Sequence, residues 1–171
     1  PIMNQRAADL GCLNSNFVNP NGLPDDNHYT TAYDLAMITA HAMQNEEFRK
    51  IVSTYQTTVS GPEGKRYLTN HNKLLRSYEG AIGLKTGFTK KCGRCLVSAA
   101  VRDSVSLTCV TLNAPDDWND HKRLLDFILI RIKILDLTCN LYREIICRDG
   151  LDKVYPAYSI DQIVPICLYI V

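Results

Sequence analysis

Apolar residues recur with helical spacing at the start of the chain. The pattern over residues 3–10 predicts the last turns of a helix that stops at Gly11, because glycine readily adopts the left-handed conformation found just after helices. Residues 14–28 lack such a pattern and are rich in Asn, Pro, Gly and Asp, which form turns. We therefore expect a loop between this helix and the next element.

Two more helices are predicted over residues 32–43 and 46–52. The apolar side chains of the first of them fall on one stripe, as expected of a helix that covers a core. Thr30 or Thr31 can cap this helix, and Asp34 can complete a capping box with Thr31.

From residue 57 the pattern changes to short runs rich in β-branched and aromatic residues, separated by turn formers. A long helix that begins after residue 117 is apolar enough to cover the resulting sheet. Strands joined by short turns, with helices on either side in sequence, predict an α+β fold in which helices cover a mainly antiparallel sheet. The predicted strands are residues 57–59, 66–69, 81–88, 96–101 and 107–112.

Beyond about residue 133 the chain consists of short β-rich pieces, at residues 142–147, 153–158 and 163–171. We expect residues 1–133 to form one domain and residues 134–171 to be part of a small β-rich domain. Fewer than about forty residues bury little apolar surface alone, so this module is either incomplete or leans on the first domain.

Length and composition suit an ordinary globular domain, with 171 residues, 46% of them hydrophobic, and a net charge of +1. The charge gives no electrostatic footprint for nucleic acid, so we expect no nucleic-acid partner.

No apolar run approaches the length that spans a bilayer, and a helical pattern starts at the first residues of the chain. We expect the natural N-terminus to lie elsewhere, and membrane association only through segments absent from this chain.

Seven cysteines show no regular framework. The pair Cys92 and Cys95 could supply half of a zinc site, but no second pair accompanies it. We expect free thiols, no metal and no cofactor.

Candidate chemistry gathers in residues 82–89, where Lys85, Thr86 and Gly87 are consecutive in an extended run. Alternation in a strand would place Lys85 and Gly87 on one face and Thr86 on the other. Gly87 would also let a ligand approach the backbone closely. The triplet alone is weak, because Lys-Thr-Gly occurs by chance in solvated hairpins.

The context of the triplet is far more specific. In this order and spacing, several stretches make the chain resemble the C-terminal part of low-molecular-mass penicillin-binding proteins, the serine D-alanyl-D-alanine carboxypeptidases. These stretches are Met3-Asn4 with Ala7 and Leu10-Gly11, Asn16-Phe17-Val18-Asn19-Pro20-Asn21-Gly22-Leu23, His28-Tyr29-Thr30-Thr31-Ala32-Tyr33-Asp34-Leu35-Ala36, Asn70-His71-Asn72, and Gly83-Leu84-Lys85-Thr86-Gly87-Phe88-Thr89 with Gly93.

The resemblance implies a β-lactamase/transpeptidase-like fold and a role for each residue of the triplet. Lys85 would place a positive charge beside the nucleophile, and Thr86 would hydrogen-bond the terminal carboxylate of the substrate. Gly87 would let the peptide lie against the strand, and the backbone N–H of Phe88 would donate to the oxyanion. Implied partners are peptidoglycan stem peptides ending in D-Ala-D-Ala and β-lactam antibiotics, and the implied location is the cell-wall side of the bacterial membrane.

Two motifs of the family, Ser-x-x-Lys and Ser-x-Asn, are missing. No serine of the chain has lysine three positions later or asparagine two positions later. Both motifs come first in the family, so we expect an inactive fragment that is truncated at its start. Two alternatives are a relative of the serine β-lactamases, and a non-catalytic binding remnant of the same fold.

Three other features bear on the site. Some members of the family hold the substrate carboxylate with a second ligand, an arginine after the final strand, but residues 116–121 here are acidic, with Arg123 beyond them. The second carboxylate ligand is therefore in doubt.

His71 and His121 are expected to have structural roles, since the family needs no catalytic histidine.

Overall fold

The fold combines five helices with seven strands in the part of the chain that the structure, a computed structural model, describes: residues 1–102, 104–138 and 166–170, with side chains through residue 131. The helices are α1 (Ile2–Asp9), α2 (Ala32–Ala42), α3 (Glu46–Ser53), α4 (Leu74–Ser77) and α5 (Asp117–Thr138). The strands are β1 (Gln56–Gly61), β2 (Gly64–Thr69), β3 (Ala81–Gly83), β4 (Thr86–Thr89), β5 (Gly93–Arg102), β6 (Val105–Thr111) and β7 (Ile166–Ile170).

Local signals set the helix ends. α1 stops before Gly11, whose φ of 79° is the left-handed conformation predicted for it. Thr31 caps α2 by accepting a hydrogen bond from the backbone N–H of Asp34, at 3.1 Å. The predicted capping box is wrong, because the Asp34 carboxylate instead accepts from the N–H of Asn14 and the hydroxyl of Ser15 in the preceding loop.

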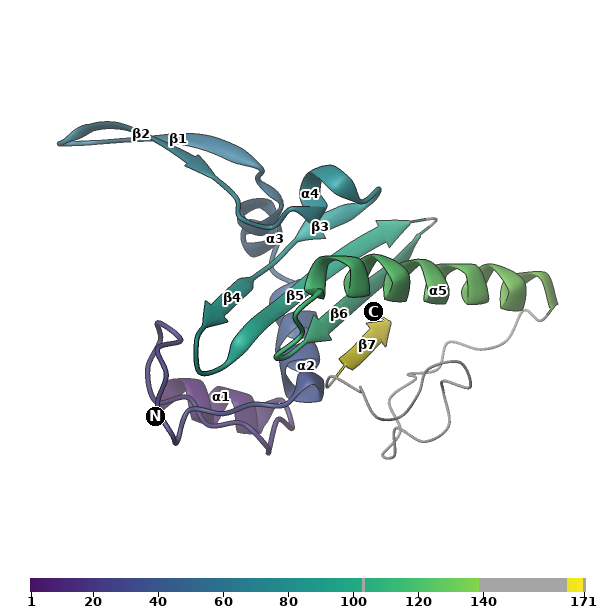
Figure 1. Cartoon of the computed structure of the whole chain (residues 1–171), viewed down its shortest axis with the longest axis horizontal. Helices are drawn as coiled ribbons and strands as arrows, with labels where there is room; N and C mark the ends of the chain where they lie inside the picture. The colour runs from purple at the N-terminus through teal and green to yellow at the C-terminus, as the bar shows by residue number, and fades with distance from the viewer. Residues whose placement is uncertain (103, 139–165, 171) are drawn as a thin grey trace.

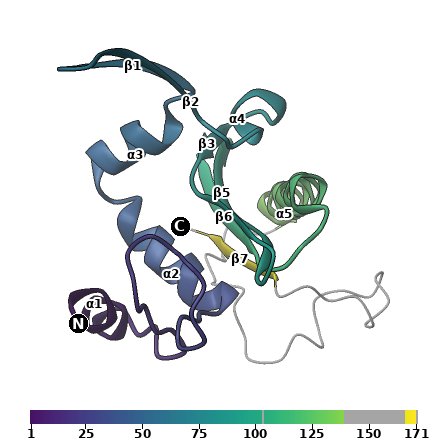
Figure 2. The same ribbon diagram turned by 60° about the vertical axis from the view of Figure 1, so that its left-hand side comes forward.

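The central sheet is antiparallel, as predicted. β5 lies between β6 on one side and the successive segments β3 and β4 on the other, and β7 pairs with the far side of β6. The helix α5 lies along one face of this sheet, and α2 lies on the other (Figures 1 and 2). The α+β layered fold is therefore confirmed.

The two faces of the sheet carry separate apolar clusters. Ala100, Leu107 and Cys109 face α5 and pack with its residues Leu125 and Ile128. The neighbouring positions point the opposite way, because side chains alternate along a strand. Val97 and Val110, which are paired across β5 and β6, pack near Ala32 and Ala36 of α2.

A single strand over residues 81–88 was predicted, and this is wrong. The run is broken into β3 and β4 at Gly83 and Leu84, whose φ angles are 103° and 93°. The register against β5 shifts at the same place, as in a β-bulge. The kink changes the direction of the strand, and with it the direction in which the side chains from Lys85 onward point.

β1 and β2 form a separate two-stranded hairpin that projects from the body of the protein (Figure 1). Every residue of both strands is exposed to solvent. The predicted hairpin is confirmed, with longer strands than expected.

The predicted division at residue 133 stays a prediction. α5 continues through that position to Thr138, and the predicted pieces 142–147 and 153–158 lie outside the described residues. Part of the third piece is β7, which pairs with the central sheet. None of the described helices is long and apolar enough to cross a membrane.

Candidate active site

The strand β4 presents its backbone at a sheet edge. Lys85 and Val97 form a hydrogen-bonded pair, with N···O distances of 3.1 and 2.9 Å in the two directions. Because such pairs alternate with non-hydrogen-bonded pairs, the N–H groups of Thr86 and Phe88 point away from β5. Among the described residues β4 pairs only with β5, so the Phe88 N–H lies on an open edge.

The side chain of Lys85 is exposed beside this edge. Its ammonium group donates a hydrogen bond to the carbonyl of Thr86, which also points away from β5. Lys85, Thr86 and Gly87 line a mainly apolar cavity of about 390 Å³, together with Leu35 of α2 and Phe48 of α3. A group placed in this cavity would therefore lie next to the Lys85 charge.

The glycines of this region differ in what the fold requires of them. A Cβ atom at Gly83 would lie 2.2 Å from the Val52 carbonyl oxygen, and one at Gly93 would lie 2.0 Å from the Asn113 side chain. Both glycines also have positive φ. A Cβ at Gly87 would make only ordinary contacts with Cys95, at 3.8 and 3.9 Å, and its φ is not positive. Gly87 is thus not required by the fold.

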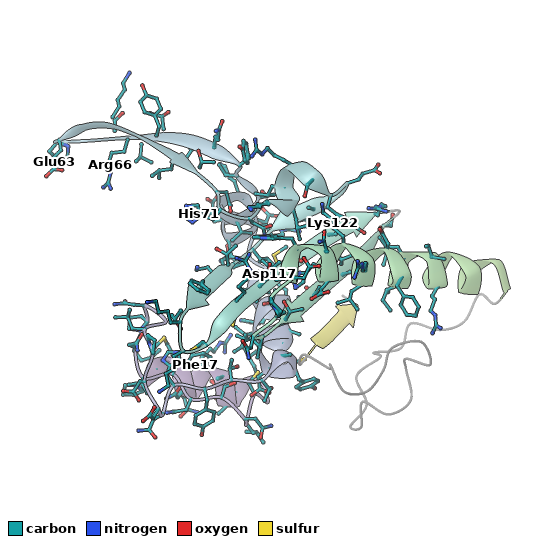
Figure 3. The ribbon with its side chains drawn as sticks, in the orientation of Figure 1. Phe17, Glu63, Arg66, His71, Asp117 and Lys122 are labelled. Carbon is teal, nitrogen blue, oxygen red and sulfur yellow. The ribbon has the colours of Figure 1, made fainter. Side chains whose placement is uncertain are left out.

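An arginine that the sequence did not single out lies on the α5 side of the sheet. Arg94 of β5 contacts Asp117 at the start of α5, with its Nε and Nη2 atoms 3.1 and 2.9 Å from the same carboxylate oxygen. Figure 3 shows Asp117 where α5 begins above β5. Arg123, the arginine that follows the acidic residues 116–121, is exposed. Because the partners are 23 positions apart in the sequence, no local signal indicated the pair.

Of the two histidines expected to have structural roles, only His121 is buried. His121 is fully buried between α5 and the sheet, where its Nδ1 lies 2.5 Å from the Ser98 hydroxyl and its Nε2 lies 3.0 Å from the Thr111 hydroxyl. Burial lowers the pKa of His121 to about 3, so the ring is neutral. His71 is exposed at the base of the projecting hairpin (Figure 3), and it is the neighbouring Asn70 that bonds the Val52 and Thr54 carbonyls.

The cysteines that the structure describes with side chains, Cys12, Cys92, Cys95 and Cys109, are unpaired. Cys95 lies opposite Gly87 in the β4–β5 register and borders the cavity. No cluster of His, Cys, Asp and Glu large enough to hold a metal ion occurs among the described residues.

Comparisons with known proteins place the chain in a family. Residues 1–116 match the D-alanyl-D-alanine carboxypeptidase family of peptidases. The carboxypeptidase DacF of Bacillus subtilis is 33% identical over 129 residues, which are 73% of this chain and 33% of that protein. DacB2 of Mycobacterium tuberculosis is 32% identical over 133 residues, which are 73% of this chain and 46% of that protein. The chain spans a third to a half of the length of these curated relatives.

Solved structures share the fold. A D-alanyl-D-alanine carboxypeptidase from Mycobacterium tuberculosis superposes with a TM-score of 0.69 at 30% identity, over 75% of this chain and 52% of that one. A variant of the Streptomyces K15 DD-transpeptidase superposes with a TM-score of 0.70 at 33% identity, over 75% of this chain and 53% of that one. The match over two thirds of the residues shows that the chain belongs to the D-alanyl-D-alanine carboxypeptidase family, among the low-molecular-mass penicillin-binding proteins.

Proposed function

We propose that this chain supplies the Lys-Thr-Gly side of the active site of a serine D-Ala-D-Ala carboxypeptidase, which trims peptidoglycan stem peptides through an acyl-enzyme. The observation that carries the proposal is the open edge of β4. There three features lie within four residues: the N–H of Phe88, which has no partner among the described residues, the charge of Lys85, and the glycine that the fold does not need.

Each of these groups has a task in acyl transfer. An extended peptide laid along the edge of β4 would pass Gly87 without a side chain in its way. A serine hydroxyl that attacks the carbonyl of the penultimate D-Ala leaves a negative charge on the carbonyl oxygen, and the Phe88 N–H is placed to donate to it. The C–N bond then breaks, the last D-Ala leaves as the amine, and water later hydrolyses the ester.

The nucleophile must come from outside these 171 residues, since they lack Ser-x-x-Lys and Ser-x-Asn. The curated relatives are two to three times as long as the matched region, which leaves room for both motifs in the part that this chain does not span. A serine presented from the cavity between the sheet, α2 and α3 would stand beside Lys85. The ammonium charge would keep a neighbouring proton-transfer lysine neutral and stabilise the developing oxyanion.

The proposed partners follow from this site. They are stem peptides ending in D-Ala-D-Ala and β-lactams, both of which present an acyl group and a carboxylate to the same edge, where the Thr86 hydroxyl can bond the carboxylate. An enzyme with this substrate works on the cell-wall side of the bacterial membrane.

Labelled penicillin tests the proposal. The isolated 171-residue chain is expected to form no covalent adduct, because it has no serine in the required motif. The longer protein that contains Ser-x-x-Lys is expected to be labelled, and to release D-Ala from a D-Ala-D-Ala peptide. Failure of that longer protein to acylate would instead support a non-catalytic remnant of the fold.

A further inference from the structure

We propose that Arg94 binds the terminal carboxylate of the substrate, on the side of the site opposite the Lys85 cavity. This inference rests on the proposed function, because it assumes a peptide that lies along β4 and ends in a free carboxylate. It also supplies the second carboxylate ligand that residues 116–121 do not offer.

The register places Arg94 beside the carboxylate-binding hydroxyl. Thr86 is paired with Leu96, and Phe88 is paired with Arg94. Arg94, Leu96 and Ser98 alternate onto one face of β5, and this is the α5 face, because Ser98 contacts His121 of α5. The side chains of Thr86 and Arg94 are thus diagonal neighbours on that face, within reach of a long side chain.

Asp117 holds the Arg94 guanidinium in place but accepts hydrogen bonds from only some of its donors. Nε and Nη2 both donate to one oxygen of Asp117, whose side chain is only 4% exposed, and that oxygen also accepts the N–H of Trp118 at 2.9 Å. The Arg94 side chain is 39% exposed, and in the part of the chain that the structure describes its Nη1 makes no hydrogen bond. A partly exposed, oriented guanidinium with free donors is suited to bind a carboxylate.

Arg94 and Lys73 both lie near the Trp118 ring at the start of α5. The guanidinium carbon lies 5.9 Å from the centre of the Trp118 ring, and the Lys73 ammonium lies 5.8 Å from the same centre. Two cations therefore lie close to one indole, and of these Arg94 is the one paired with Asp117. The carboxylate of Asp116 accepts hydrogen bonds from the Asn119 side-chain amide, at 2.8 and 3.1 Å, and makes none to Arg94 among the described residues.

The chain carries its own reporter for this site, because Trp118 is its only tryptophan. We suggest titrating the 171-residue chain with N-acetyl-D-Ala-D-Ala and with the same peptide as its C-terminal amide, and following Trp118 fluorescence. The acid is expected to bind at least about tenfold more tightly than the amide, since only the acid offers a charged acceptor to Arg94.

Three variants separate binding from structure. Arg94→Gln is expected to reduce the preference for the acid to less than about threefold, but it leaves the buried Asp117 without its cation. The double variant Arg94→Gln/Asp117→Asn removes both charges together and is expected to lose the preference as well. The matched control is Arg102→Gln at the other end of β5, where Arg102 likewise pairs with a carboxylate of α5, Asp126, at 3.6 Å. Arg102→Gln is expected to keep the preference.

Any of three results would overturn the assignment of Arg94: equal binding of acid and amide by the unmodified chain, no saturable response to the acid, or an unchanged preference in both Arg94 variants. The proposed function is tested separately, by acylation of the longer protein with penicillin. Acylation that is equally fast with and without Arg94 would reject this inference alone. A carboxylate preference in a longer protein that never acylates would reject the carboxypeptidase activity alone.

Discussion

Gly83 and Gly87 lie four residues apart in the same run but are glycines for different reasons. Gly83 has a φ of 103° and approaches the Val52 carbonyl so closely that no side chain fits. Gly87 has neither constraint, and its missing side chain leaves the edge of β4 open. A glycine that the fold does not require points to a close approach by something outside the fold.

Alanine substitutions test this contrast. Gly87→Ala is expected to change the free energy of unfolding by less than about 0.5 kcal/mol, but to slow acylation of the longer protein by penicillin about a hundredfold, because the new methyl group displaces the ligand. Gly83→Ala is expected to destabilise the fold by more than about 1 kcal/mol. Chemical denaturation and an acylation assay measure the two effects. A Gly87→Ala protein that acylates at the normal rate would show that nothing lies against this strand.

At the scale of elements, α5 is joined to the sheet by a buried polar contact. His121 lies between the hydroxyls of Ser98 on β5 and Thr111 on β6, inside an otherwise apolar layer. A neutral imidazole can donate to one hydroxyl and accept from the other, whereas a protonated ring has no acceptor. The contact therefore depends on His121 staying neutral.

This contact predicts a loss of stability in acid. The pKa of His121 is about 3 in the folded protein and about 6.5 when unfolded. Between these values the unfolded chain binds the extra proton, so the free energy of unfolding falls as pH drops, by up to about 1.4 kcal/mol per pH unit from this group. Denaturation of the 171-residue chain between pH 7 and pH 4 measures the slope.

Two variants assign that slope to His121. His121→Gln keeps a donor and an acceptor but does not titrate, so its stability is expected to depend less steeply on pH. His71→Gln, at an exposed histidine, is expected to keep the slope of the unmodified chain. Identical slopes for all three proteins would contradict the role given to His121.

Local signals in the sequence located most elements but not their distortions. The start of α2 was predicted at Thr30 or Thr31, and Thr31 is the cap, because capping depends on neighbouring residues. The break at Gly83 and Leu84 was missed, since strand propensity continues through it and the Val52 contact that accompanies it comes from a distant helix. The same limit applied to the site. The Lys-Thr-Gly motif is local and was found, whereas Arg94 is recognisable only through its contact with Asp117, 23 residues away.

At the scale of the whole molecule, the sheet separates two kinds of chemistry. The α2 side holds the cavity with Lys85 at its rim, where charge would assist proton transfer and acyl transfer. The α5 side holds Arg94 and the Trp118 ring, where a carboxylate would be bound. The Phe88 N–H lies on the edge between them. A peptide along β4 would thus meet a different group on each side.

The thiols of the whole chain provide another prediction. Burial raises the pKa of the Cys12 and Cys109 thiols, so these react slowly in the folded protein, whereas Cys92 is exposed. Titration with a disulfide reagent is expected to show rapid reaction at Cys92 in native buffer and all seven thiols after denaturation. Recovery of one thiol after denaturation would mean three disulfides and contradict this expectation.

The most direct test of the proposed active site is the rate at which penicillin acylates the longer protein when Lys85 is changed to alanine. We expect acylation to slow by two or more orders of magnitude, about the loss of one preorganised electrostatic contact, while the protein still folds. Lys90→Ala, at an exposed residue of the following turn, should leave the rate unchanged. Near-normal acylation by a folded Lys85→Ala protein would show that Lys85 is a solvated strand residue, and it would contradict the assignment of the Lys-Thr-Gly edge as the active site.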